Sequence, residues 1–129
     1  DGGNNDYLAA LLGLSDIRKS SDDEGFLRIG KADRECNIRK YIDKVSECID
    51  VDKRFFSFAG NLDFNVKNIG ICTGAGVEFA RSAFDMNILD IGHYGSEKIF
   101  ITNMANYLRR NTDLNVFESK ADLNPFILI

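Results

Sequence analysis

Twice in this chain, a short run of β-branched and apolar residues passes through glycine directly into a segment with helical periodicity. One such unit spans residues 67–84, with Gly74 and Gly76 at its turn; the other spans residues 86–110, with Gly92 at its turn. Apolar runs of this length are typical of buried strands, and the segments that follow are typical of amphipathic helices. Strands that alternate with helices need crossover connections. We therefore expect an α/β fold with a mixed, largely parallel sheet and helices packed on it.

Other periodic segments extend this expectation. Ile38, Ile42, Val45 and Ile49 recur at helical spacing, which predicts an amphipathic helix over residues 37–49. The further predicted elements are a helix at residues 5–12, a polar loop at 15–24, and strands at 26–29, 54–59 and 114–118. No internal repeat divides the chain, so we predict a single α/β domain over residues 1–129.

Composition narrows the possible partners and the compartment. The chain has 16 Lys and Arg against 20 Asp and Glu, a net charge of −4, with the signs mixed. Binding to a nucleic-acid backbone depends on clustered basic residues, so this balance argues against a nucleic-acid partner. No apolar run approaches the ~20 residues of a membrane span. Cys36, Cys48 and Cys72 show neither metal-ligand nor disulfide spacing. They are expected to be reduced, as in the cytoplasm.

The only histidine of the chain stands where a predicted buried strand ends and a helix begins. In open α/β sheets this edge is where ligands bind. Glu97 follows His93 by one helical turn, so both side chains can project toward one point. An imidazole and a carboxylate together suit a divalent transition ion, which can polarise a phosphate or activate water. His93 and Glu97 are thus candidate metal ligands; the alternative is a surface histidine and a glutamate placed by the helix dipole.

The glycine-rich turn at residues 72–76 is the second candidate site. Glycines between a strand and a helix present backbone N–H groups that can hold an anion, so Gly74 and Gly76 are candidate binding residues for an anionic group. The turn is neither a complete G-x-G-x-x-G nor a P-loop, and its glycines can equally serve only a tight turn. Ser96 has no second histidine as its base, which argues against a serine hydrolase. We assign no catalytic residue.

The element Gly92-His93-Tyr94-x-x-Glu97, after a strand ending in Asp90, resembles the hallmark of the GTP cyclohydrolase I type 2 family, also called the Nif-three-like family. Segments of the chain that resemble family elements in the same order are Asn4-Asn5-Asp6 with Leu8-Ala9, Phe26-Leu27-Arg28-Ile29-Gly30, the glycine-rich turn, and Asn124-Pro125-Phe126. The resemblance spans nearly the whole chain.

This resemblance implies an incomplete Nif-three-like fold. It implies two divalent metal ions per subunit in the intact fold, with His93 and Glu97 among their ligands, and does not distinguish zinc, iron and manganese. It also implies a homo-oligomer, a hexamer. The family's other ligands come from an N-terminal segment that this sequence lacks. A strand-helix unit is expected to be missing between about residues 76 and 88, either lost or outside the sequence given.

Two functional hypotheses follow from the resemblance. The first is a metal-dependent hydrolase-like protein that acts on a nucleotide or another phosphorylated small molecule. The second is a non-catalytic metal-binding scaffold that recruits a protein partner. A family name alone fixes no substrate.

Overall fold

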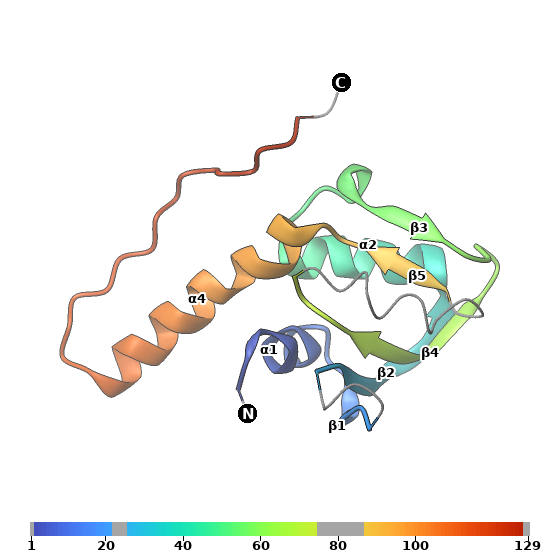
Figure 1. Ribbon diagram of the computed structural model, residues 1–129, viewed down its shortest axis with the longest axis horizontal. Helices are drawn as coiled ribbons and strands as arrows, with labels where there is room; N and C mark the ends of the chain where they lie inside the picture. Colours follow the sequence, from blue (N-terminus) through green and yellow to red (C-terminus); the bar gives the residue numbers. More distant parts are fainter. Residues whose placement is uncertain (1, 22–25, 75–86, 128–129) are drawn as a thin grey trace.

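Two small antiparallel sheets and three helices make up the part of the chain that the computed structural model describes, residues 2–21, 26–74 and 87–127 (Figure 1). The elements in order are α1 (Asn4–Leu11), β1 (Ser15–Lys19), β2 (Arg28–Asn37), α2 (Ile38–Ile49), a 3-10 turn η1 (Lys53–Phe55), β3 (Ser57–Ala59), β4 (Asn65–Ile71), β5 (Ile88–Asp90) and α4 (His93–Asn111). The predicted helix at residues 77–84 lies outside the described residues.

The first sheet has the order β1-β2-β4, and the second pairs β3 with β5. Every strand pair among the described residues is antiparallel, so the prediction of a largely parallel sheet is wrong. The error concerns which strands meet. We expected β4 and β5 to share one sheet through crossover helices, whereas β4 pairs with β2 and β5 pairs with β3. The α/β character itself is confirmed.

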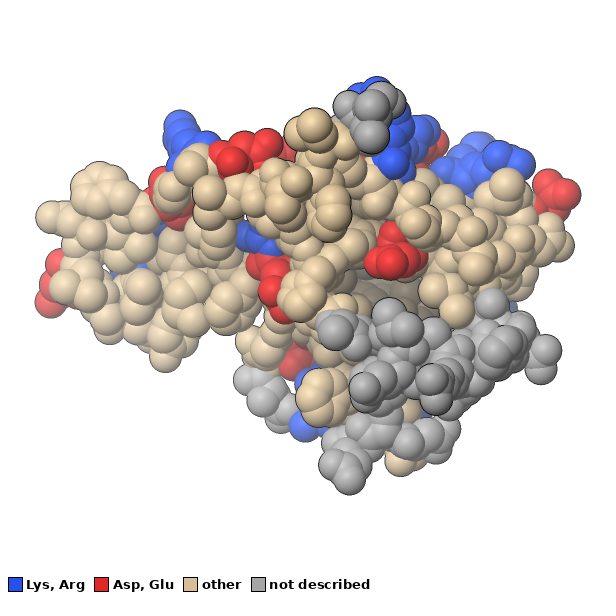
Figure 2. All heavy atoms as spheres, turned by 45° about the horizontal axis from the view of Figure 1, so that its top comes forward, with Lys and Arg blue, Asp and Glu red and all other residues tan. Residues whose placement is uncertain are grey.

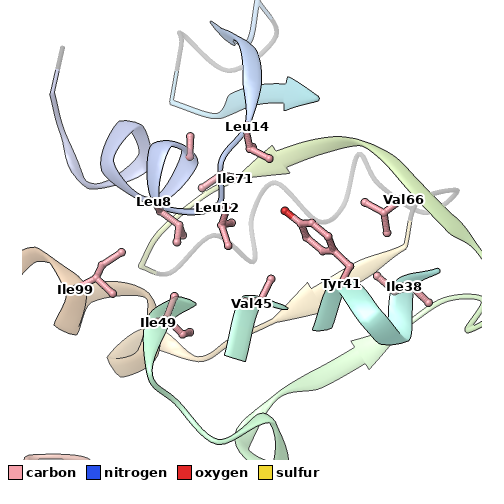
Figure 3. Packing of buried hydrophobic residues seen from close by; sticks show 11 residues of the cluster. Leu8, Leu12, Leu14, Ile38, Tyr41, Val45, Ile49, Val66, Ile71 and Ile99 are labelled. Atoms are coloured by element: carbon pink, nitrogen blue, oxygen red, sulfur yellow. The ribbon is translucent and has the colours of Figure 1, made fainter. Parts of the chain in front are cut away.

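Helix α2 carries the predicted apolar face, except that Ile42 is only partly buried and Tyr41 is buried beside it. Ile38, Tyr41, Val45 and Ile49 are buried on it, and the amide oxygen of Asn37 accepts a hydrogen bond from the N–H of Arg39 at its start. These side chains meet apolar residues of α1, β4 and α4, as Figure 3 shows for the labelled residues. The full cluster of buried apolar residues is Leu8, Ala9, Leu12, Leu14, Ile38, Tyr41, Val45, Ile49, Val66, Ile71 and Ile99. The core therefore lies where α1, α2 and β4 converge.

Several predicted boundaries differ from the structure. Ser15–Lys19, expected to be loop, is an edge strand whose five residues are all exposed, so no alternation of apolar and polar residues marks it. Strand β2 continues to Asn37 rather than ending before Gly30. The predicted strand at 54–59 is shorter, because Lys53–Phe55 forms the 3-10 turn, which the side chain of Asp52 caps.

The predicted strand at residues 114–118 is wrong. This segment is extended, pairs with no strand among the described residues, and runs outside the fold after α4 (Figure 1). It is fastened to α4 by side chains instead. The guanidinium of Arg109 donates to Glu118 Oε1 at 2.8 Å and to the carbonyl oxygen of Val116 at 3.0 Å. Leu114 and Phe117 are left exposed.

The sequence argued against a nucleic-acid partner and against a membrane span, and the surface and the helices can be compared with both predictions. On the face shown in Figure 2, basic and acidic side chains of the described residues lie interspersed, not gathered into a field of one sign. Among the helices of the described residues, none is both long enough and apolar enough to cross a membrane.

An ion pair between Asp6 and Arg28 fastens α1 to β2. The hydrogen bond from the Arg28 guanidinium, with the N–H of Gly2 as a second donor, lowers the pKa of Asp6 from 3.8 to about 2. A carboxyl whose folded pKa is depressed stabilises the fold above its unfolded pKa. That stability is lost as the pH falls from about 4 to about 2.

We therefore expect Asp6→Asn to lower the free energy of unfolding at pH 7 by about 1–2 kcal/mol, after allowance for solvent screening. The difference from wild type should shrink as the pH falls toward 2. Urea unfolding across this pH range measures it. Asp16→Asn, which breaks the exposed pair with Lys31, is the control and should have little effect at any pH. An Asp6→Asn difference that does not depend on pH would contradict the role of the carboxylate.

Candidate metal centre

The strand end that precedes the histidine is shaped by local backbone contacts. Asp90, the last residue of β5, accepts a hydrogen bond from the N–H of Gly92 at 2.8 Å through its side chain. Gly92 has a φ of +73°, a conformation that favours glycine, and it caps α4. The chain therefore turns at once from strand into helix, and His93 is the first residue of α4.

His93 and Glu97 meet on the first turn of α4. The Nε2 atom of His93 lies 2.9 Å from Oε2 of Glu97, and the two side chains are 62% and 51% exposed. The predicted convergence of these residues is thus found in the structure. Their exposed position leaves the outer side of both groups open to a further partner.

Gly74 lies against the same pair. Its φ is +78°, and a Cβ placed on it would stand 3.2 Å from Oε1 of Glu97 and 4.0 Å from Nε2 of His93. Three of the four residues that sequence reasoning singled out are therefore gathered at one place. The fourth, Gly76, lies outside the described residues.

Two N–H groups of the described part of this turn, those of Thr73 and Gly74, donate to protein side chains. Thr73 donates to Oδ1 of Asn5 at 2.7 Å, and Gly74 donates to Oγ of Ser96 at 3.3 Å. Because Gly74 has no Cβ, it leaves free space beside the Glu97 carboxylate. The role of Gly74 and Gly76 in holding an anion stays a prediction, because a cradle involving Gly76 falls beyond the described residues.

The sequence placed Asn4 and Asn5 in a segment that resembles the family, but it indicated no contact of theirs with the candidate site. The helix predicted at residues 5–12 begins at Asn4, and its N-cap is Gly3, which makes no side-chain cap hydrogen bond. The side chain of Asn4 donates to the carbonyl oxygen of Ser96 at 3.1 Å, and that of Asn5 contacts Thr73. An asparagine pair at a helix start was the available signal, but such pairs also occur simply as caps.

The residues present fit part of a divalent-cation site. Ligands about 2.1 Å from one ion lie roughly 3.0–3.4 Å apart, depending on the angle between them, and the observed 2.9 Å is close to that range. Gly74 leaves the space that a larger residue would fill. Among the described residues, no cluster of three or more His, Cys, Asp or Glu side chains could hold a metal ion. His93 and Glu97 thus supply two ligand positions, and a complete site needs more.

The chain is similar to a known protein family and to two named relatives. The model of the family described as Duf34/NIF3 (NGG1p interacting factor 3) matches residues 1–88. A protein of Lactococcus lactis named GTP cyclohydrolase 1 type 2 homolog is 28% identical over 150 residues, covering 97% of this chain and 58% of its own length. A Clostridium perfringens protein of the same name is 25% identical, covering 99% of this chain and 60% of its own.

A solved structure agrees with the fold. The crystal structure of the Staphylococcus aureus hypothetical protein SA1388 superposes with a TM-score of 0.76 at 16% identity, over 99% of this chain and 64% of its own. The chain thus spans about three fifths of the length of the curated relatives it matches. Their alignments, 150 and 158 residues long, exceed its 129 residues, so each relative has residues without a counterpart here. That a strand-helix unit is missing between about 76 and 88 stays a prediction.

Proposed function

The chain belongs to the Duf34/NIF3 family, and on this premise we propose that it is a metal-dependent hydrolase-like protein acting on a nucleotide or another phosphorylated small molecule. The observation that carries the proposal is the 2.9 Å approach of His93 Nε2 to Glu97 Oε2 beside Gly74. The shared name of two relatives, GTP cyclohydrolase 1 type 2 homolog, supports a nucleotide-like substrate. The proposal includes a cytoplasmic homo-oligomer, a hexamer by resemblance.

In this proposal His93 and Glu97 hold a divalent cation through their Nε2 and carboxylate oxygens. The cation supplies a Lewis acid that can polarise a phosphate or lower the pKa of water. Ser96, 3% exposed, accepts the N–H of Gly74 and donates to the carbonyl oxygen of His93 at 2.9 Å. It thereby fixes the turn against the helix that carries both ligands. The remaining ligands and a second cation require residues beyond this cluster.

We expect His93→Ala to abolish binding of Co²⁺ or Zn²⁺ at this site, because the carboxylate of Glu97 alone is a weak exposed ligand. Metal content after dialysis and titration calorimetry with Co²⁺ measure the loss. Tyr107→Ala, at an exposed position far along α4, is the control and should bind as wild type does. Binding by His93→Ala at wild-type stoichiometry would show that the assignment is wrong.

The second candidate, a metal-binding scaffold that recruits a protein partner, is favoured by an exposed apolar surface. Ile101, Met104 and Tyr107 on α4 are 51%, 40% and 61% exposed, and Phe117 in the C-terminal segment is 90% exposed. A groove of about 700 Å³ lies between α4 and that segment, with Glu97 in its lining. The family description, NGG1p interacting factor 3, names an interaction.

Assay of the metal-loaded protein with nucleotides and phosphoesters separates the two candidates. Turnover that disappears in His93→Ala supports the hydrolase. Bound metal without turnover of any of these compounds supports the scaffold.

A further inference from the structure

The start of α1 contacts both parts of the candidate metal centre. Asn5 accepts the N–H of Thr73 at 2.7 Å, which lies 68 residues later in the chain. Asn4 donates to the carbonyl oxygen of Ser96 at 3.1 Å, which lies 92 residues later. Because successive side chains of a helix point in different directions, one pair of neighbouring asparagines reaches the glycine turn and the first turn of α4 at once.

These contacts join into one network. The Nδ2 group of Asn5 donates to the carbonyl oxygen of Phe26 at 2.9 Å, so both polar atoms of its amide are engaged. Ser96 links the two branches, since its Oγ accepts the N–H of Gly74 while its carbonyl oxygen accepts from Asn4. Its hydroxyl also donates a hydrogen bond to the carbonyl oxygen of His93. The backbone on both sides of the His93–Glu97 pair is therefore fixed by buried or half-buried hydrogen bonds.

We infer that Asn4 and Asn5 are positioning residues of the metal centre. They hold Gly74 at the distance that leaves Glu97 turned toward His93, and their hydrogen bonds among the described residues go to Ser96, Phe26 and Thr73 and not to the ligand side chains. This inference rests on the proposed function, in that His93 and Glu97 must bind a cation. Groups that hydrogen-bond to metal ligands typically change metal affinity about 10–100-fold when removed, and we expect the lower end of this range for residues that act through the backbone.

Asn4 has one further property that fits this role. Its Oδ1 atom is buried and has no hydrogen-bond partner, and the residue lines the groove beside Glu97. A buried amide oxygen without a partner costs stability. The hydrogen bond from Asn4 Nδ2 to Ser96 explains why an asparagine stands at this position despite the cost of its unpaired Oδ1.

The test compares Asn5→Leu with Asn37→Leu. Asn37 makes the same two kinds of bond as Asn5, accepting the N–H of Arg39 at 2.9 Å and donating to the carbonyl oxygen of Leu62 at 3.2 Å. It lies at the start of α2 instead of beside the metal centre. Both variants should lower the thermal unfolding midpoint by a similar amount.

Only Asn5→Leu, and Asn4→Leu with it, should weaken Co²⁺ binding, by about tenfold or more. Both should also change the visible absorption spectrum of bound Co²⁺, whereas Asn37→Leu should give the wild-type spectrum. If Asn5→Leu does not fold, Asn5→Ser, which keeps a shorter acceptor for Thr73, should show a smaller change in the same direction.

The outcomes separate the two proposals. If wild type binds Co²⁺ in a manner that depends on His93, while the variants of Asn5 and Asn37 have equal affinities and spectra, the positioning role is overturned and the metal site stands. If His93→Ala binds Co²⁺ as wild type does, the proposed function fails and this inference fails with it.

Discussion

Replacing Ile49 with alanine is expected to lower the free energy of unfolding by about 3–4 kcal/mol. Ile49 is 1% exposed and is the largest fully buried side chain among the described residues. It ends the apolar face of α2 and packs beneath α4, where its Cδ1 atom is 3.7 Å from the position of a Cβ on Gly95. The substitution removes three carbon atoms from a site closed on several sides, so the loss combines reduced apolar burial with a cavity.

Urea unfolding followed by circular dichroism measures this change. Ile101→Ala is the matched control, because it removes the same atoms from a side chain that is 51% exposed on α4. It should change stability by less than about 0.5 kcal/mol. Equal losses for the two variants would mean that Ile49 does not lie in the core. The comparison also tests the contact between α2 and the helix that carries both candidate ligands.

The success of sequence reasoning depended on how far apart the interacting residues are in the chain. Helix α2 was predicted from its apolar spacing, and the meeting of His93 and Glu97 from one turn of a helix. Both are local relations that the backbone geometry imposes. The network of Asn4 and Asn5 could not be found in this way, because its partners Thr73 and Ser96 lie 68 and 92 residues away.

Strand pairing shows the same limit. The periodicity of a segment indicates that it is a strand, but not which edge it joins, and a parallel sheet was inferred only from alternation with helices. β1 escaped prediction because an exposed edge strand has no buried face to produce alternation. The segment at 114–118 has strand-like composition, yet Arg109 and Thr102 of α4 donate hydrogen bonds to Glu118, and within the described part of the chain no strand pairs with this segment. In all three regions, contacts with residues distant in the sequence determine whether the segment forms a strand and which strand it pairs with.

Gly74→Ala is expected to weaken Co²⁺ binding about tenfold or more. Its φ of +78° costs a residue with a Cβ about 1–2 kcal/mol, so some stability is lost as well. The larger effect is local, because the new Cβ would lie 3.2 Å from Oε1 of Glu97. At that distance the carboxylate must move by a few tenths of an ångström, which shifts it relative to His93.

Gly70→Ala, four residues earlier in β4, is the control, since a Cβ there has no atom within 4 Å. It should leave Co²⁺ affinity unchanged. Calorimetric titration of both variants tests whether Gly74 serves the turn alone or also leaves space for a cation beside Glu97. A Gly74→Ala protein that is less stable but binds Co²⁺ as wild type does would show that Gly74 serves only the turn. A loss of affinity confined to Gly74→Ala would mean that the cation needs the space which only glycine leaves beside Glu97.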